Sequence, residues 1–126
     1  MMIREMMNAK IHGAVVTDKN LHYTGSLGVE PALLEAAGIL PYEKIQVVNL
    51  ANGERMWTYA IEGDPGAGQC VLNGGMAHRG EIGDRLLIIT YAQFDEQALR
   101  QHRPRVLVIG EDNHTFETIE HMVVSP

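Results

Sequence analysis

The chain has 126 residues, of which 45% are hydrophobic and 21% charged, a composition that suits one globular domain over residues 1–126. Sixteen acidic against ten basic residues give a formal net charge of −6, which disfavours a surface for nucleic acid or for an anionic membrane. The single cysteine excludes a disulfide within the chain, and the lack of both a run of about 18 apolar residues and a signal-peptide core predicts a cytoplasmic protein.

The first part of the chain alternates short strand patterns with turn signals. In order, we expect a strand over residues 10–17, a turn over 18–20, an extended segment over 21–24 and a break over 25–28. The one good helix pattern covers residues 30–37. Pro31 suits a first helical position, strong helix formers follow it, and Gly38 suits the left-handed position just past the end.

The second part is mostly strand and turn. Asn52-Gly53 predicts a tight turn between strands over residues 43–50 and 54–61, because both residue types tolerate positive φ. The remaining expected elements are a loop over 63–69, strands over 86–91 and 105–109, a helical turn within 95–101, a turn over 111–113 and a last strand over 115–124. Many short strands with one helix predict a small, mainly β barrel.

Several common active-site chemistries find no support in the sequence. None of the six histidines has a metal-ligand spacing, so no metal site is predicted. The glycine-rich stretch 63–68 lacks the Lys-Ser/Thr of a phosphate loop, and Thr24 stands where a serine-hydrolase elbow requires glycine. No signature surrounds Cys70, which is typical of a buried structural thiol.

A series of short motifs does indicate a family. The series is Lys10-Ile11-His12, Leu21-His22-Tyr23-Thr24-Gly25-Ser26, Asn52-Gly53-Glu54-Arg55, Thr58-Tyr59-Ala60-Ile61, Asn73-Gly74, Ala77-His78 and Gly83-Asp84. In this order and at these separations the chain resembles the pyruvoyl-dependent aspartate decarboxylases, which make β-alanine for pantothenate synthesis. The resemblance runs from about residue 3 to Arg103-Pro104, and more loosely through residues 111–113.

This resemblance implies a double-psi β-barrel with one or two short helices, a homotetramer, and self-cleavage between Gly25 and Ser26. The residue types suit such cleavage, because a serine hydroxyl can attack the preceding carbonyl and turn the amide into an ester. Gly25 leaves that carbonyl sterically open, and a strained turn there would favour the reaction. Elimination then frees residues 1–25 and leaves on residues 26–126 a pyruvoyl group, the covalent cofactor, made from Ser26 itself.

Several residues have side chains that suit decarboxylation of L-aspartate. The pyruvoyl ketone condenses with the substrate amine and accepts the electron pair that the departing CO₂ leaves. The planar guanidinium of Arg55 suits a carboxylate, and Lys10 adds a second positive charge. If residues 54–61 form a strand, Arg55 and Tyr59 share one face and Thr58 points to the other.

The resemblance implies the following roles. Tyr59 is the general acid, Thr58 assists ester formation and contacts substrate, Asn73, Gly74, Gly75 and Met76 form a substrate-contacting loop, and His12 and Tyr23 line the site.

Two departures from the family pattern leave alternatives open. Gly13 stands where an arginine is usual, which removes a positive charge near the cleavage region and suggests dependence on a maturation helper protein. Gly75 and Met76 replace the usual alanines of the substrate loop. The alternatives are a β-barrel binding or scaffold module that does not process itself, and a pyruvoyl decarboxylase of another amino acid.

Overall fold

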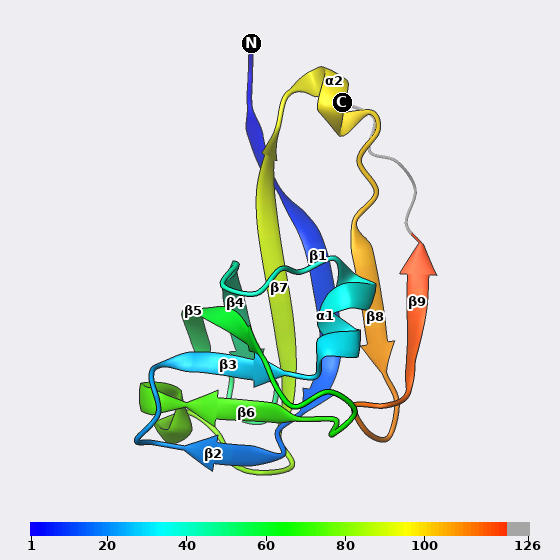
Figure 1. The fold of residues 1–126 in the computed structure, drawn as a ribbon. Helices are drawn as coiled ribbons and strands as arrows, with labels where there is room; N and C mark the ends of the chain where they lie inside the picture. The colour runs from blue at the N-terminus through cyan, green and yellow to red at the C-terminus, as the bar shows by residue number, and fades with distance from the viewer. Residues whose placement is uncertain (121–126) are drawn as a thin grey trace.

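The fold is mainly β, as the sequence predicts, and the computed structural model describes residues 1–120 (Figure 1). The strands are β1 (Arg4–Val15), β2 (Asp18–Asn20), β3 (Ser26–Val29), β4 (Lys44–Asn49), β5 (Arg55–Glu62), β6 (Cys70–Asn73), β7 (Arg85–Phe94), β8 (Arg105–Ile109) and β9 (Phe116–Glu120). The helices are α1 (Pro31–Ala37), the 3-10 helix η1 (Gly74–His78) and the short α2 (Glu96–Leu99).

The strands form one sheet that wraps around a single core. Their order is β2-β6-β3-β5-β4-β7-β1-β8-β9, with parallel pairs β2–β6, β3–β5 and β1–β8 and antiparallel pairs elsewhere. Fully buried aliphatic side chains from most of these strands fill the interior, among them Ile11, Leu27, Ile45, Leu72, Ile88 and Leu107. The result is a small barrel-like body, with η1 at the edge nearest β6 (Figure 1).

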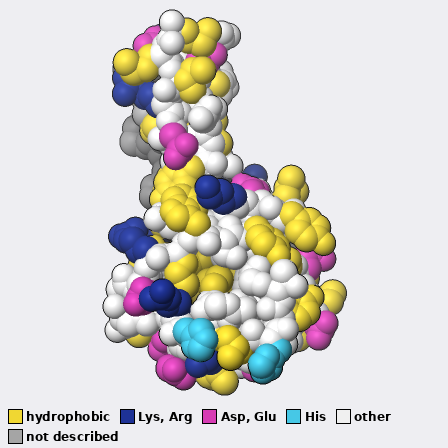
Figure 2. All heavy atoms as spheres, turned by 90° about the vertical axis from the view of Figure 1, so that its left-hand side faces the viewer, with side chains coloured by type: hydrophobic (Ala, Val, Ile, Leu, Met, Phe, Trp, Pro, Cys, Tyr) yellow, Lys and Arg dark blue, Asp and Glu magenta, His cyan; other side chains and the backbone are white. Residues whose placement is uncertain are grey.

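Beyond this body, the first residues of β1 and the last residues of β7 continue as a two-stranded arm that carries α2 at its tip (Figure 1). Figure 2 shows the arm as a narrow projection above the rounded body, with hydrophobic side chains exposed on this face. His102 fastens α2 to the arm, because its ring stacks on Phe94 and its Nε2 lies 2.8 Å from the carbonyl oxygen of Met7.

Local signals predicted the helix and the hairpin. Helix α1 begins at Pro31 and is closed by Gly38, whose φ of 72° is left-handed. Strands β4 and β5 pair on either side of Asn52-Gly53, but only Gly53 takes a positive φ, because the connection is longer than a two-residue turn. The helical turn at α2, the loop over residues 63–69 and strand β8 are confirmed.

Pairing with distant strands overturns other expectations. The turn expected over residues 18–20 is strand β2, because those residues pair with β6. The extended segment expected over 21–24 is a turn and bend, with the Tyr23 N–H donating to Asn20 O at 3.3 Å. Strand β1 begins six residues before the expected start, and β7 extends to Phe94. The last strand covers Phe116–Glu120, and the part expected over 121–124 lies outside the described residues.

One buried carboxylate fixes the end of strand β3. Glu30 follows β3, is 3% exposed, and accepts hydrogen bonds from Gly68 N at 2.7 Å, Ala32 N at 3.2 Å and Gly66 N at 3.3 Å. Burial alone would raise the pKa of Glu30, but the three N–H donors and the nearby His114 outweigh it, so its pKa lies below the usual value. Glu30 therefore joins β3, helix α1 and the glycine-rich loop through an ionised carboxylate.

Substituting Glu30→Gln should lower the free energy of unfolding by about 2 kcal/mol at pH 7, since the amide replaces a charged acceptor of backbone hydrogen bonds. A carboxylate with a lowered folded pKa stabilises the protein above the ordinary glutamate pKa of about 4.3, and this contribution is lost as the pH falls through the folded pKa. Urea denaturation between pH 7 and 3 should therefore show the difference between wild type and variant narrowing below about pH 4. A difference that stays constant over that range contradicts the assignment.

Candidate active site

The bond between Gly25 and Ser26 lies where the chain passes from the surface into the core. Residues 21–25 are all exposed, whereas residues 26–30 are all buried, and Ser26 itself is 1% exposed. Space is open beside the Gly25 α-carbon, since a side chain there would meet no atom within 4 Å. The bond therefore combines an accessible carbonyl side with a serine whose position is fixed.

Two hydrogen bonds hold the Ser26 hydroxyl. Its Oγ donates to the carbonyl oxygen of Thr24 at 3.0 Å and accepts from Asn73 Nδ2 at 3.2 Å. Asn73 is also buried and lies directly opposite Ser26 in the antiparallel pair of β3 and β6. The amide of Asn73 is thus a neutral hydrogen-bond donor aimed at the group expected to react.

The backbone of Gly74 packs closely against the residues before the expected cleavage site. Gly74 has a φ of +65°, and a Cβ on it would lie 2.7 Å from Gly25 Cα, 2.8 Å from Gly25 N and 3.1 Å from Tyr23 O. Only a residue without a side chain permits this approach. The segment 23–25 is therefore packed directly on the start of η1.

Strand register places Tyr59 beside Ser26. In the parallel pair of β3 and β5, Leu27 lies opposite Ala60, and both are fully buried. Extending this register by one residue makes Ser26 and Tyr59 neighbours on the opposite face of the sheet, where Ser26 is nevertheless covered and only 1% exposed. Thr58 lies opposite the fully buried Ile45, so it points inward, as alternation along the strand predicts.

Arg55, His12 and Lys10 also share the outward face but lie away from Ser26. A row of paired residues runs across the sheet from Arg55 on β5 to His12 on β1. It passes through Val48 on β4 and Leu87 on β7. Lys10 lies two residues before His12 and shares its face, apart from the bulges in β1.

Within one chain the strand positions of these cations lie apart from the position of the serine. Arg55 is four residues from Tyr59 along β5, which is about 13 Å at 3.3 Å per residue. Lys10 and His12 are on β1, which β7, β4 and β5 separate from β3 in the sheet order. The structure therefore brings Ser26, Tyr59, Asn73 and Gly74 together and leaves the cationic residues elsewhere on the same face.

A surface groove runs beside the serine. It has a volume of about 350 Å³ and is lined by residues from β2, β3, β5, β6 and the loop before β6, including Tyr23, Gly28, Asn73 and the carboxylate residues Asp18, Glu62 and Asp64. A second hollow of about 340 Å³ shares Tyr23, Ile61 and Glu62 with it and extends to Pro41 and Tyr42. Tyr23 thus lines both hollows.

The substrate loop expected over residues 73–76 is only partly exposed. Gly75 faces solvent, whereas Met76 is buried and its side chain belongs to the hydrophobic core. The side chain of Met76 therefore packs in the interior.

Competing chemistries find no support in the geometry. Complete burial raises the pKa of the Cys70 thiol to about 12, so this side chain stays protonated and unreactive. Among residues 1–120 no cluster of three or more histidine, cysteine, aspartate or glutamate side chains could hold a metal ion.

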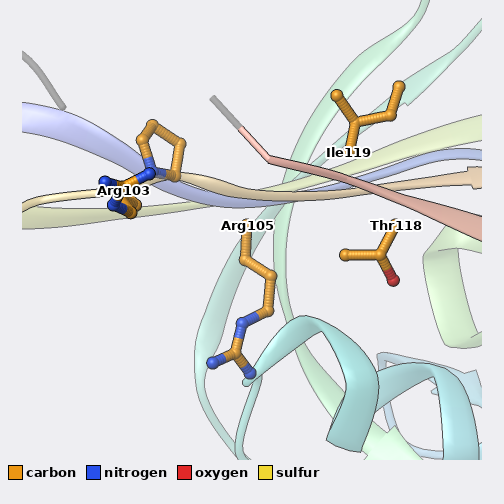
Figure 3. A pocket seen from close by; sticks show the side chains of 5 residues that line it. Arg103, Arg105, Thr118 and Ile119 are labelled. Atoms are coloured by element: carbon orange, nitrogen blue, oxygen red, sulfur yellow. The ribbon is translucent and has the colours of Figure 1, made fainter. Parts of the chain in front are cut away.

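A separate pocket of about 190 Å³ lies between β8 and β9, lined by Arg103, Pro104, Arg105, Thr118 and Ile119 (Figure 3). There the guanidinium of Arg105 extends toward α1 and lies 3.5 Å from the Ala36 carbonyl oxygen. This pocket contains none of the expected site residues.

Sequence reasoning missed one residue of the second hollow. Tyr42 has a ring centroid 6.2 Å from that of Tyr59 and lines the second hollow. The signal that marks its position is the dipeptide Pro41-Tyr42 between the helix and β4, which is typical of a turn.

The fold and site define a small barrel-like β protein with a buried serine after an exposed glycine and with no reactive thiol at the site. In the part of the chain that the structure describes, no helix has the length and apolar character needed to cross a membrane.

Comparison with known proteins identifies the family. The model of the aspartate decarboxylase family matches residues 2–116. The aspartate 1-decarboxylases of Staphylococcus aureus strains JH9 and Newman are each 49% identical to this chain over 118 residues, covering 94% of the chain and 93% of each relative. The chain belongs to the aspartate decarboxylase family.

The contact between Gly74 and Gly25 predicts a sharp difference between two neighbouring glycines. Gly74→Ala should destabilise the protein by about 3 kcal/mol, because its Cβ collides with backbone and its φ is left-handed. Gly75→Ala should change stability by no more than about 0.5 kcal/mol, since its Cβ position is open. Thermal unfolding of the two variants measures this, and equal melting temperatures would contradict the close approach.

Proposed function

We propose that this protein decarboxylates L-aspartate to β-alanine and CO₂, for pantothenate and coenzyme A biosynthesis, after cleaving itself between Gly25 and Ser26. Membership of the aspartate decarboxylase family supports the reaction. The observation that carries the proposal is the buried Ser26, held by Asn73 directly after an exposed glycine. A cytoplasmic location is part of the proposal and fits a biosynthetic enzyme.

The cleavage uses only groups of this chain and one water molecule. The Ser26 Oγ attacks the Gly25 carbonyl carbon, the peptide C–N bond breaks, and the Ser26 nitrogen takes the proton, which leaves an ester. Elimination of the ester releases the Gly25 carboxylate and leaves dehydroalanine at position 26. Water then replaces the nitrogen, which departs as ammonia, and a keto group remains at the new terminus.

The residues around Ser26 fit such a keto group. The hydrogen bond from Asn73 Nδ2 to the serine oxygen, at 3.2 Å, supplies a donor that suits a carbonyl oxygen equally well. Cleavage removes the hydroxyl and so frees the Thr24 carbonyl from its bond to Ser26. When formed, the pyruvoyl group supplies an electron sink for the pair that the departing α-carboxylate leaves.

Other side chains bind the substrate and move its proton. Tyr59, beside Ser26 on the outward face, donates a proton to the carbon that has lost CO₂. Arg55 binds a substrate carboxylate through its two parallel N–H donors, and Lys10 adds positive charge. Thr58 assists ester formation and contacts substrate, and residues 73–76 contact the substrate with His12 and Tyr23 lining the site.

A homotetramer is the assembly that we propose. The spacing between Arg55 and Tyr59 along β5, about 13 Å between backbone positions, supports an assembly in which a neighbouring copy completes the site. Arg55 of one copy would then serve the Ser26 terminus of its neighbour. A maturation helper protein is also a proposed partner, because Gly13 stands where the family usually has an arginine. In this chain the Arg85 guanidinium lies beside Gly13 and donates to its carbonyl oxygen at 3.1 Å.

The first test concerns Ser26. Intact-mass measurement of the purified protein should show two species, residues 1–25 and 26–126, whereas Ser26→Ala should remain full length and release no β-alanine from L-aspartate. A wild-type chain that stays full length after prolonged incubation indicates a module that does not process itself. A processed protein that consumes glutamate or another amino acid in preference to aspartate indicates a different substrate.

The second test concerns Arg55. Arg55→Ala should lower kcat/KM for L-aspartate by a factor that corresponds to about 2–3 kcal/mol, the scale of a charged hydrogen-bonded contact. If copies share sites, refolding Arg55→Ala together with inactive Ser26→Ala should restore part of the activity, because a mixed pair contains one complete site. Unchanged kcat/KM in Arg55→Ala removes this residue from the site, and failure of the mixture to regain activity places both residues in one chain.

A further inference from the structure

Tyr42 has a backbone conformation that its residue type disfavours. Its φ is +71°, and it is the only non-glycine residue with a positive φ in the part of the chain that the structure describes. It occupies the third position of a turn in which the Glu43 N–H donates to Leu40 O at 3.1 Å and Pro41 holds the second position. That pattern is a type II turn, whose third position favours glycine or asparagine. A bulky side chain at such a φ is strained.

Hydrogen bonds hold this turn against the strand that carries Tyr59. The Tyr42 N–H donates to the carbonyl oxygen of Ala60 at 2.7 Å, and the Ala60 N–H donates to the carbonyl oxygen of Glu43 at 3.1 Å. Ala60 directly follows Tyr59 and is fully buried. The backbone of Tyr42 is therefore fixed relative to that of Tyr59.

The ring of Tyr42 does not compensate the strain by packing in the core. The side chain is 78% exposed, although the ring is large and apolar. Its centroid lies 6.2 Å from that of Tyr59 with the planes tilted by 33°, a separation typical of interacting aromatic pairs. It also forms a wall of the hollow that Tyr23, Ile61 and Glu62 line. The strained position places the ring of Tyr42 next to the ring of Tyr59.

We propose that Tyr42 is a positioning residue for the reaction, which fixes the orientation of the Tyr59 ring. This inference rests on the proposed function, in which the Tyr59 O–H gives its proton to the α-carbon and regains one from water. Backbone strain is often found at active sites, where it fixes the position of a reacting side chain and lowers the stability of the fold.

The test uses variants that relieve the strain and remove the ring. Tyr42→Asn should leave the melting temperature equal or raise it by roughly 3 °C, since asparagine tolerates positive φ. The same variant should lower kcat for L-aspartate about tenfold with a smaller change in KM, because the acid is misplaced and the substrate carboxylates are not. The solvent deuterium isotope effect on kcat should increase as proton donation becomes slower.

Two companion variants make the outcome specific. Tyr42→Phe keeps the ring and should retain most of the wild-type kcat. Leu40→Ala changes an exposed residue of the same turn that lines neither hollow, and its kcat should match that of wild type. All variants are compared after complete processing and with their assembly state checked by light scattering.

The contrary results are distinct. If Tyr42→Asn loses stability and activity together, the role of Tyr42 is structural. If only KM rises, Tyr42 acts only as a wall of the second hollow. Either result overturns the proposal. If wild type and Tyr42→Asn decarboxylate L-aspartate equally well, the proposal is wrong while the proposed function stands. If processed wild type releases no β-alanine, the proposed function fails and this inference fails with it.

Discussion

The site depends on the close approach of two backbone segments that are distant in sequence. Residues 23–25 pack directly on Gly74, where a Cβ would lie within 2.8 Å of two Gly25 atoms. The neighbouring Asn73 then faces Ser26 across the β3–β6 pair and donates to its hydroxyl. At the other end of the four-residue strand β3, the carboxylate of Glu30 binds the glycine-rich loop. Ser26 is therefore held from both sides, and a cleaved chain would keep its new terminus in place through β5, β6 and Glu30.

The distribution of charge on this face supports the proposed assembly. The groove beside Ser26 carries the carboxylate residues Asp18, Glu62 and Asp64, which disfavour binding of the two carboxylates of L-aspartate. The cationic candidates Arg55 and Lys10 lie on the same face but further along the sheet. The proposed homotetramer would bring positive charge from another copy to this groove.

Local sequence signals predicted helix α1 and the β4–β5 hairpin, because a proline, a glycine and an Asn-Gly pair act within a few residues. The reversal at residues 18–24 could not be predicted in this way, since β2 is a strand only through its pairing with β6. The motif series indicated candidate site residues, and alternation along β5 predicted that Arg55 and Tyr59 share one face. Which of them meet Ser26 depends on strand register, and the contact of Tyr42 with Tyr59 depends on a turn held against β5.

The central claim is that Ser26 becomes a reactive keto terminus in the active protein. The most direct measurement is to label freshly purified, catalytically active protein with a carbonyl-specific hydrazine and to locate the label by tandem mass spectrometry. We predict a single labelled site at position 26, at the start of the fragment 26–126, with loss of activity in proportion to labelling. Active protein in which position 26 is an unmodified serine within an intact chain would contradict the account.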